Sequence, residues 1–155
     1  MSYVHWIAGS ILGLAWLSRL LDAALGMPKV ADISRPEWDP KPNDPKPRVS
    51  IIVPARNEEE HIGQTLVRLL ALDYENYEMI AVNDRSTDRT GEVMDRVAKI
   101  PQALGRLRVT HVAGLPGGWM GKPHAMWIGA HQASGDWVLF TDADVLFKPD
   151  VLSQP

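Results

Sequence analysis

The sequence predicts an α/β fold in which a mostly parallel β-sheet carries helices on both faces, preceded by an N-terminal membrane helix. Two observations lead to this prediction. From residue 49 onward, short apolar runs alternate with helical patterns at the spacing of βαβ units. Before that region, residues 4–27 are almost entirely apolar. We therefore predict a membrane-anchor helix over residues 1–27, a proline-rich linker over residues 28–47 and an α/β domain over residues 48–155.

The composition is that of an ordinary globular protein, and it excludes several classes of function. The chain has 155 residues, a hydrophobic share of 45%, a charged share of 23% and a net charge of −3. Because there is no large basic run, the sequence predicts no nucleic-acid partner. Because there is no cysteine, disulfide bonds, thiolate catalysis and cysteine-ligated zinc are excluded.

The apolar segment from Val4 to Met27 has the length of the ~20 residues that a membrane-spanning helix requires. Arg19 and Asp22 interrupt it, but they stand three residues apart and so share one face of a helix. Arg19 also lies near one end, where its long side chain can reach water. The alternative is an amphipathic helix that lies on a membrane or packs on the domain.

The residues that follow the apolar segment predict a linker and an orientation. Lysine and arginine occur repeatedly after the segment and not before it, which predicts a plasma or inner membrane protein whose domain faces the cytoplasm. Six prolines between residues 28 and 47 forbid regular helix, so an extended tether is expected there.

The first half of the domain reads as strand, helix, strand, helix. Val49–Val53 is β-branched and predicts a buried strand that stops at Pro54. Asn57 and the acids Glu58–Glu60 then begin a helical pattern, in which acids in the first turn suit the helix dipole. A second strand covers Met79–Val82 and ends at Asn83-Asp84. The helix that follows has N-cap candidates in Ser86, Thr87 and Asp88 and runs to about Ala98.

The second half repeats this alternation. Leu107–Val112 predicts a third strand, and a glycine-rich loop follows it. A helix is expected from Pro123, a residue type tolerated at a helix start, to about Ala133. Trp137–Thr141 predicts a fourth strand. Parallel α/β sheets bind ligands outside the carboxyl ends of their strands, so the polar residues that follow each strand should gather at one edge.

Asp142 and Asp144 follow the fourth strand and are the clearest candidate metal ligands. In extended chain, residues two apart point to the same side, so the two carboxylates can converge. Mg²⁺ or Mn²⁺ takes oxygen ligands and commonly combines one or two carboxylates with substrate phosphates. The alternative is a plain turn, because aspartate is common after strands.

Three further side chains lie at the same predicted edge. The carboxylate of Asp84 could accept a hydrogen bond from a nucleobase or ribose, or could only cap the next helix. The guanidinium of Arg56 could bind phosphate or stack on a base, or could pair with Glu59 or Glu60 on the surface. Lys122 could meet a diphosphate near the helix start, or could be ordinary solvated surface.

Four stretches, PARNEE at 54–59, VNDRSTDRT at 82–90, GWMGKPHAM at 118–126 and FTDADV at 140–145, resemble the family 2 glycosyltransferases with the Rossmann-like GT-A fold. The order and spacing of the four blocks match, from about Arg48 to the end of the chain. The helix and proline-rich start are most similar to the membrane-anchored branch, the ceramide glucosyltransferase-like and hopanoid-associated enzymes.

The resemblance implies a nucleotide-sugar donor, with UDP-sugars the usual case, and an acceptor hydroxyl, here lipid-linked. The implied metal ligands are Asp142 and Asp144, holding Mg²⁺ or Mn²⁺ that assists the departure of UDP. Asp84 would hold the uracil. The implied nucleotide-sugar-binding residues are Pro54, Ala55, Arg56, Glu58, Asp84, Lys122 and Asp142.

The resemblance also covers only the donor-binding half of such an enzyme, and the general base is expected beyond residue 155. Asn83 stands where the family commonly has aspartate, and Trp127 stands where many relatives carry Asn or Gln. Two alternatives remain. The chain could be a nucleotide-binding or interaction module without catalysis. It could also be another nucleotide-using α/β enzyme, although the loop after the first strand is acidic and glycine-free rather than glycine-rich and basic.

Overall fold

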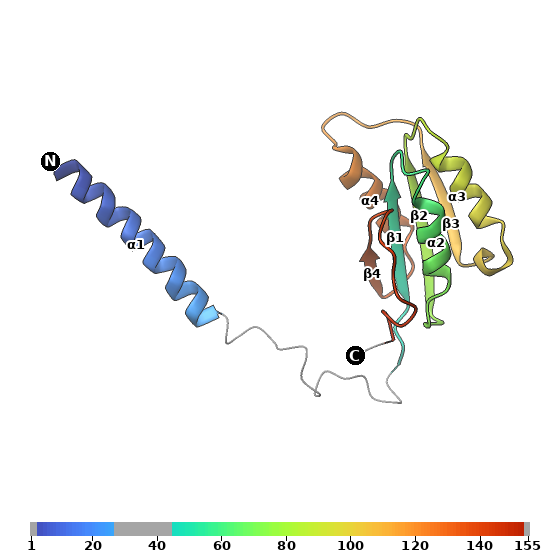
Figure 1. Cartoon of the computed structure of the whole chain (residues 1–155), viewed down its shortest axis with the longest axis horizontal. Helices are drawn as coiled ribbons and strands as arrows, with labels where there is room; N and C mark the ends of the chain where they lie inside the picture. Colours follow the sequence, from blue (N-terminus) through green and yellow to red (C-terminus); the bar gives the residue numbers. More distant parts are fainter. Residues whose placement is uncertain (1–2, 27–44, 154–155) are drawn as a thin grey trace. The chain divides into compact units, whose positions relative to one another are not determined.

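The structure is a computed structural model that describes residues 3–26 and 45–153. The chain divides into two compact units, one with helix α1 and one with the sheet (Figure 1). Most of the predicted linker, residues 28–44, lies outside the described residues, as do the two ends of the predicted anchor.

Helix α1 (Tyr3–Gly26) takes up the predicted anchor segment as 24 residues of continuous helix. Among the described residues, it is the one helix long and apolar enough to cross a membrane. Arg19 and Asp22 lie on one face of α1, as predicted, and form an ion pair there with a nitrogen–oxygen distance of 3.7 Å. The length and composition of α1 are therefore those of a membrane helix.

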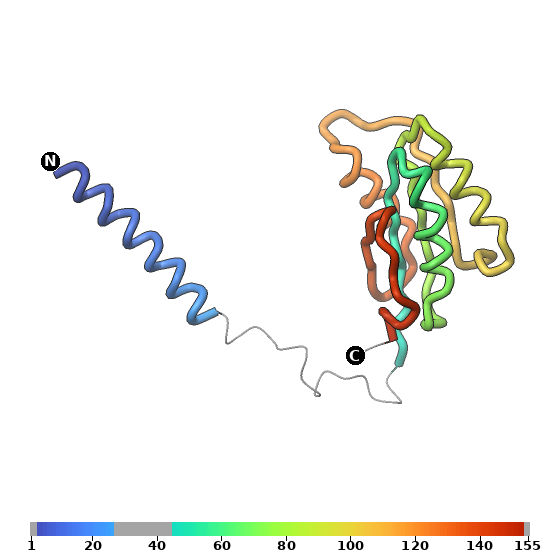
Figure 2. Tube along the Cα trace, viewed as in Figure 1, coloured from blue at the N-terminus to red at the C-terminus, as the bar shows by residue number. Residues whose placement is uncertain are grey.

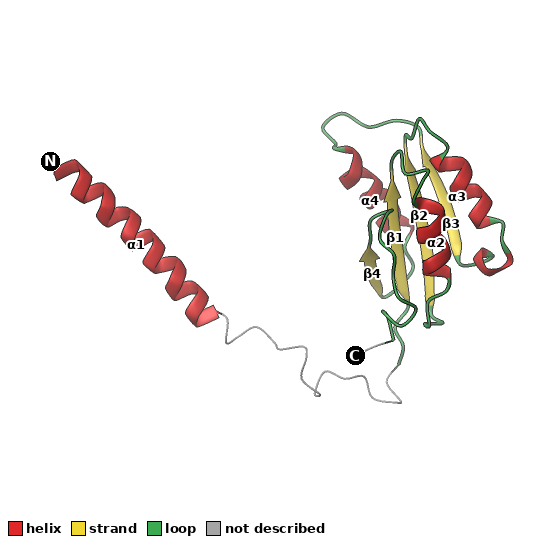
Figure 3. Cartoon of the chain, viewed as in Figure 1, coloured by secondary structure: helices red, strands yellow, loops and turns green. Residues whose placement is uncertain are grey.

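The second unit contains four parallel strands in the order β3-β2-β1-β4, which confirms the predicted fold class. The strands are β1 (Val49–Ala55), β2 (Tyr77–Asp84), β3 (Leu107–Val112) and β4 (Trp137–Phe140). Helices α2 (Ile62–Leu70), α3 (Thr90–Ala98) and α4 (Gly121–Gln132) connect them, with a 3₁₀ turn at Pro101–Ala103. Figure 3 shows that the loops leaving β1, β2 and β3 gather at one end of the sheet.

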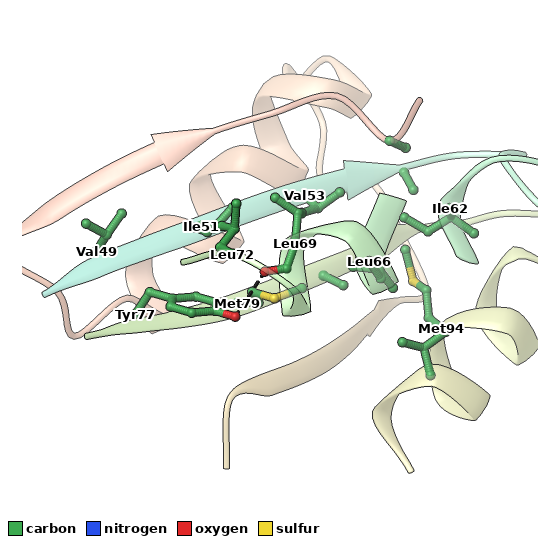
Figure 4. Close-up of a cluster of buried hydrophobic side chains, with 14 of the residues drawn as sticks. Val49, Ile51, Val53, Ile62, Leu66, Leu69, Leu72, Tyr77, Met79 and Met94 are labelled. Atoms are coloured by element: carbon green, nitrogen blue, oxygen red, sulfur yellow. Dashed lines mark hydrogen bonds between the residues drawn. The ribbon is translucent and has the colours of Figure 1, made fainter. Parts of the chain in front are cut away.

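The alternation of side chains along β1 and β2 sends apolar groups to both faces of the sheet. Ile51, Val53 and Met79 pack with α2 and α3 in the larger core, part of which Figure 4 shows. Ile80 and Val82 point the other way, against Ala125 of α4. Both strands are buried along almost their whole length, as expected for parallel strands covered by helices on both sides.

The C-terminal segment, residues 141–153, returns along the α2 side of the sheet (red in Figure 2). The Thr65 hydroxyl of α2 donates a hydrogen bond to the Ala143 carbonyl at 2.7 Å. The Asp73 amide donates to the Pro149 carbonyl at 2.6 Å. The backbone between Asp142 and Asp144 is thereby fixed to α2.

Two local predictions for the first strand and helix were wrong. Strand β1 continues through Pro54 to Ala55. Backbone groups two residues apart face the same side of a strand, and the Ile52 carbonyl faces β4, so the position where Pro54 has no N–H also faces that side. Since β4 has already ended there, no sheet hydrogen bond is lost. Helix α2 begins only at Ile62, so Glu58–Glu60 precede the helix and none lies in its first turn.

Glu78 is a buried carboxylate that ties the amino ends of three elements together. Its Oε1 accepts hydrogen bonds from the Ser50 hydroxyl at 2.7 Å and from the Ser134 amide at 2.6 Å. The Ser134 hydroxyl and the Arg48 guanidinium also bind it. Burial alone would raise the pKa of Glu78, but these bonds outweigh burial and hold the pKa below its ordinary value.

We expect Glu78→Gln to lower the free energy of unfolding at pH 7 by about 2 kcal/mol, because hydrogen bonds to a charged group contribute about 1.5–3 kcal/mol. Since the pKa of Glu78 is lower in the folded than in the unfolded chain, its contribution is complete above the unfolded value and is lost as the pH falls through the folded value. Urea unfolding at several pH values measures this.

The exposed Glu75→Gln, which removes the same charge, serves as control. The gap between wild type and Glu78→Gln should be constant near neutral pH and close in acid. A gap that persists undiminished in strong acid would contradict a stabilising role for the ionised carboxylate.

Candidate functional site

The loop after β1 and the loop after β2 are fastened to each other by their backbone amides. The Asn57 amide donates to the Ser86 hydroxyl at 3.0 Å, and the Thr87 amide donates to the Asn57 side-chain oxygen at 2.8 Å. The Glu58 amide donates to the Thr90 hydroxyl at 2.8 Å. The sequence-based prediction of Ser86 and Thr87 as helix caps was therefore wrong, because both bind the neighbouring loop instead.

The acids of the first loop take part in the same fastening. Glu59 accepts bonds from the Arg89 amide at 3.0 Å and from its guanidinium at 3.1 Å. These bonds, from the amide first, hold the pKa of Glu59 below its ordinary value. Asp88 accepts from the Glu59 amide and the Thr90 amide, so it serves the loop as well as the start of α3. Hydrogen bonds thus join the two loops into one edge of the domain.

A cavity of about 360 Å³ opens at this end of the sheet. The sequence-predicted site residues come from the loop after β1, the end of β2, the first turn of α4 and the segment after β4. The structure brings all of them to this cavity, whose lining includes Pro54, Ala55, Arg56, Glu58, Asp84, Lys122, Asp142 and Asp144.

Asp142 and Asp144 are exposed and line the same cavity, while Ala143 between them is buried. Lys122 places its ammonium 2.6 Å from the Asp142 carboxylate. Within residues 3–26 and 45–153, no group of three or more His, Cys, Asp or Glu side chains is arranged to hold a metal ion. The chain therefore offers an incoming cation two carboxylates, one of which already neutralises a positive charge.

Asp84 is almost completely buried, and its carboxylate is bound by the next residue. The Arg85 guanidinium donates to both carboxylate oxygens, at 2.8 Å and 3.1 Å. These bonds, opposed by burial and helped by the charge of Arg56, hold the pKa of Asp84 below its ordinary value. Arg85 itself has a φ of 55°, in the left-handed region. Asp84 is thus a fixed anion, and it is not a helix cap.

Gly121 lies directly against this pair, a contact that no local sequence pattern indicates. A Cβ atom at residue 121 would stand 2.7 Å from the Asp84 carboxylate and 2.8 Å from the Arg85 guanidinium. The guanidinium of Arg56 lies 3.8 Å from the same point. Arg56 is exposed, and among the ion pairs of the described residues none joins it to Glu59 or Glu60. Its charge therefore remains available to the cavity.

The model of one protein family, glycosyl transferase family 2, matches residues 50–154. A curated relative, 4,4'-diaponeurosporenoate glycosyltransferase of Staphylococcus aureus strain bovine RF122 / ET3-1, is 32% identical over 139 residues. The match covers 86% of this chain and 35% of the relative. The protein of the same name from strain USA300 is 36% identical over 99 residues, 64% of this chain and 24% of that one. The chain thus spans about a third or less of these relatives' length.

Solved structures resemble the same region. A mannosyltransferase from Pyrobaculum calidifontis, in complex with GDP-Man and Mn²⁺, has a TM-score of 0.65 and 32% identity. That likeness covers 74% of this chain and 32% of that one. Residues 1–349 of S. aureus TarS, in complex with UDP-GlcNAc, have a TM-score of 0.58 and 28% identity, covering 68% of this chain and 29% of that one.

Proposed function

The chain belongs to glycosyl transferase family 2, and on this premise we propose that its cavity binds the nucleotide diphosphate of a sugar donor, with UDP-sugars the preferred class. As part of a longer enzyme, it would serve the transfer of that sugar to an acceptor hydroxyl. The observation that supports this proposal best is the convergence of the eight predicted residues on one cavity of about 360 Å³. A volume of this order suits a small-molecule site.

The charges in the cavity suit a diphosphate. The guanidinium of Arg56 and the ammonium of Lys122 are the cationic groups that would meet phosphate oxygens. Asp84, held ionised by Arg85, presents an acceptor that suits the N–H of a uracil ring. Pro54, Ala55 and Glu58 would line the nucleotide from the β1 side.

Asp142 and Asp144 fit a hard divalent cation such as Mg²⁺ or Mn²⁺. The donor set is all oxygen, and the Lys122 ammonium already lies within bonding distance of one carboxylate, so the site holds positive charge. A bound Mg²⁺ or Mn²⁺ would neutralise the negative charge that develops on a departing UDP. Lys122 would turn from Asp142 toward the phosphates once that carboxylate is engaged.

The proposed acceptor and the proposed location are supported by α1 and by the names of the curated relatives. We infer a lipid-linked acceptor and a membrane-anchored chain, because α1 is long and apolar enough to cross a membrane and the curated relatives are named for diaponeurosporenoate. The basic residues after α1 support a domain that faces the cytoplasm from a plasma or inner membrane. The ceramide glucosyltransferase-like and hopanoid-associated branch is the assignment that suits this organisation.

Calorimetric titration of the 155-residue chain with UDP tests the proposal. We expect saturable binding to one site, strengthened by Mn²⁺, and weaker binding of UMP, which lacks the second phosphate. If no heat of binding were measured with UDP in the presence of Mn²⁺, the proposal would be contradicted. Equal binding of UDP and UMP would show that the cavity does not read a diphosphate.

Gly121→Ala should weaken UDP binding about 10-fold, by analogy with the lower end of the loss seen when groups that orient metal ligands are replaced. The reason is the 2.7 Å approach of the new Cβ to the Asp84 carboxylate. The thermal midpoint should change little, because alanine favours a helix over glycine. Gly117→Ala, with no atom within 4 Å of the added Cβ, is the matched control. Equal UDP affinities of the two variants would contradict the assignment of Asp84.

A further inference from the structure

Asn83, the residue before Asp84, belongs to a chain of hydrogen bonds that runs across the sheet edge to α3. Its side-chain Nδ2 lies 3.0 Å from Nδ1 of His111 on β3. The opposite ring nitrogen of His111, Nε2, lies 3.1 Å from the Asp95 carboxylate of α3. None of these three side chains lines the cavity.

For a neutral His111 ring, the Asp95 carboxylate at the end of this series sets the direction of each hydrogen bond. A carboxylate only accepts, so Asp95 requires the proton of His111 on Nε2. In the neutral ring, Nδ1 is then an acceptor, and it takes the N–H of the Asn83 amide. The Asn83 oxygen is left facing the Ser86 amide, which donates to it at 3.3 Å. In the opposite ring tautomer, Nδ1 of His111 would carry the proton, and the Asn83 side chain would have to flip so that its oxygen accepts that proton. The Asn83 NH₂ group would then face the Ser86 amide N–H, and the hydrogen bond between Ser86 and Asn83 would be lost.

Ser86 closes the turn that holds the Asp84–Arg85 pair. Arg85 folds back onto Asp84 with its backbone in the left-handed region. The hydrogen bond from the Ser86 amide to the Asn83 side-chain oxygen closes the turn around Arg85. The Ser86 hydroxyl in turn accepts the Asn57 amide of the β1 loop. The Asn83 side chain is therefore linked, through one residue, to both loops that line the cavity.

Gly91 on α3 packs against the contact between Asn83 and His111 and leaves room for it. A Cβ at residue 91 would stand 2.7 Å from the Asn83 Nδ2, and 3.2 Å and 3.3 Å from ring atoms of His111. A side chain at residue 91 would therefore require the Asn83 amide to shift from its present position beside His111.

We propose that Asn83, His111 and Asp95, together called the relay, act as positioning residues that orient the Asp84–Arg85 turn for nucleotide binding. This inference rests on the proposed function of the cavity. It assigns a role to three polar residues outside the cavity, and it places the control of donor affinity partly at the β3 edge of the sheet.

Gly91→Ala is the first test, because it should displace the Asn83 amide without removing any polar group, in a helix that alanine favours. We expect UDP affinity, measured by calorimetry on the full chain with Mn²⁺, to fall about 10-fold while the thermal midpoint is retained. Thr110→Val is the matched control, since it removes a 2.9 Å hydrogen bond to Gln132 from the same strand outside the relay. Its UDP affinity should equal that of wild type.

A pair of His111 variants separates the two ends of the ring. An asparagine amide can replace the Nδ1 acceptor toward Asn83, whereas a glutamine amide reaches the Nε2 position toward Asp95. We expect His111→Asn to keep UDP affinity within about 3-fold and His111→Gln to lose about 10-fold. Nitrogen-15 NMR of the wild-type ring should show the proton on Nε2.

The outcomes separate this inference from the proposed function. If wild type does not bind UDP, both fall. If wild type binds, but Gly91→Ala and His111→Gln bind equally well, only the relay is overturned. If His111→Asn and His111→Gln lost equal UDP affinity, the ring would act by packing alone. If NMR placed the proton on Nδ1, the hydrogen-bond directions would be reversed. Either result would also overturn the relay.

Discussion

Asp144→Asn should weaken the binding of UDP in the presence of Mn²⁺ by at least about 100-fold, or about 2.8 kcal/mol. Residues that only support metal ligands typically cost 10–100-fold in affinity when replaced, so a direct ligand should cost no less. Asparagine preserves the size of the side chain and removes only its charge. Calorimetry with and without Mn²⁺ measures the effect, and without metal the variant should bind UDP as wild type does.

Asp142→Asn gives a contrasting result because Asp142 also binds Lys122. With Mn²⁺ present its UDP affinity should fall, but without metal it should bind UDP at least as well as wild type, since the ammonium is released to the phosphates. Glu75→Gln, an exposed carboxylate in the loop that enters β2 at its amino end, controls for the change in net charge. If Asp144→Asn retained the Mn²⁺ effect, Asp144 would not be a metal ligand.

Gly129→Val should lower the free energy of unfolding by about 3 kcal/mol, the upper part of the range for overpacked cores. Helix α4 crosses β1 at this residue, and a Cβ there would overlap Cγ2 of Ile52, a fully buried side chain. Because Ile52 is fully buried, relieving this overlap requires Ile52 or α4 to shift within a packed core. Chemical denaturation measures the loss, and Gly114→Ala, with open space around the added Cβ, should have little effect.

A double-mutant cycle isolates the contact. Ile52→Ala removes the obstructing methyl group, so Gly129→Ala should destabilise the wild type by about 1 kcal/mol or more but have little further effect in the Ile52→Ala background. Additive losses in the double variant would mean that the Gly129 position is not limited by Ile52, and would contradict the close packing of α4 on β1.

The elements of the fold could be predicted wherever the local pattern decides the structure. Leu107–Val112 appears as the predicted strand, and α3 ends at Ala98 as predicted. The ends that depend on partners far along the chain could not be predicted. Pro54 is part of β1 because the adjacent strand β4 ends before reaching it. Glu59 precedes α2 and instead binds Arg89, thirty residues further along the chain.

The candidate site was largely visible in the sequence, because parallel strands bring the residues after their carboxyl ends together. That rule placed Arg56, Asp84 and Asp142 at one edge, and the structure places them in one cavity. The sequence did not indicate the supporting groups. Gly121 and Gly129 matter because a Cβ at either position would collide with a residue far away in the sequence, Asp84 in the first case and Ile52 in the second. No local sequence pattern indicates such a contact.

The central claim is that a divalent cation at Asp142 and Asp144 holds a nucleotide diphosphate in the cavity. Crystals of the chain grown with UDP and Mn²⁺ test it most directly, through anomalous scattering at the manganese edge. We predict one strong peak inside the cavity, in contact with a carboxylate of this pair and with the UDP phosphates, and Lys122 turned away from Asp142. UDP bound there without an anomalous peak, or a manganese peak away from both aspartates, would contradict the claim.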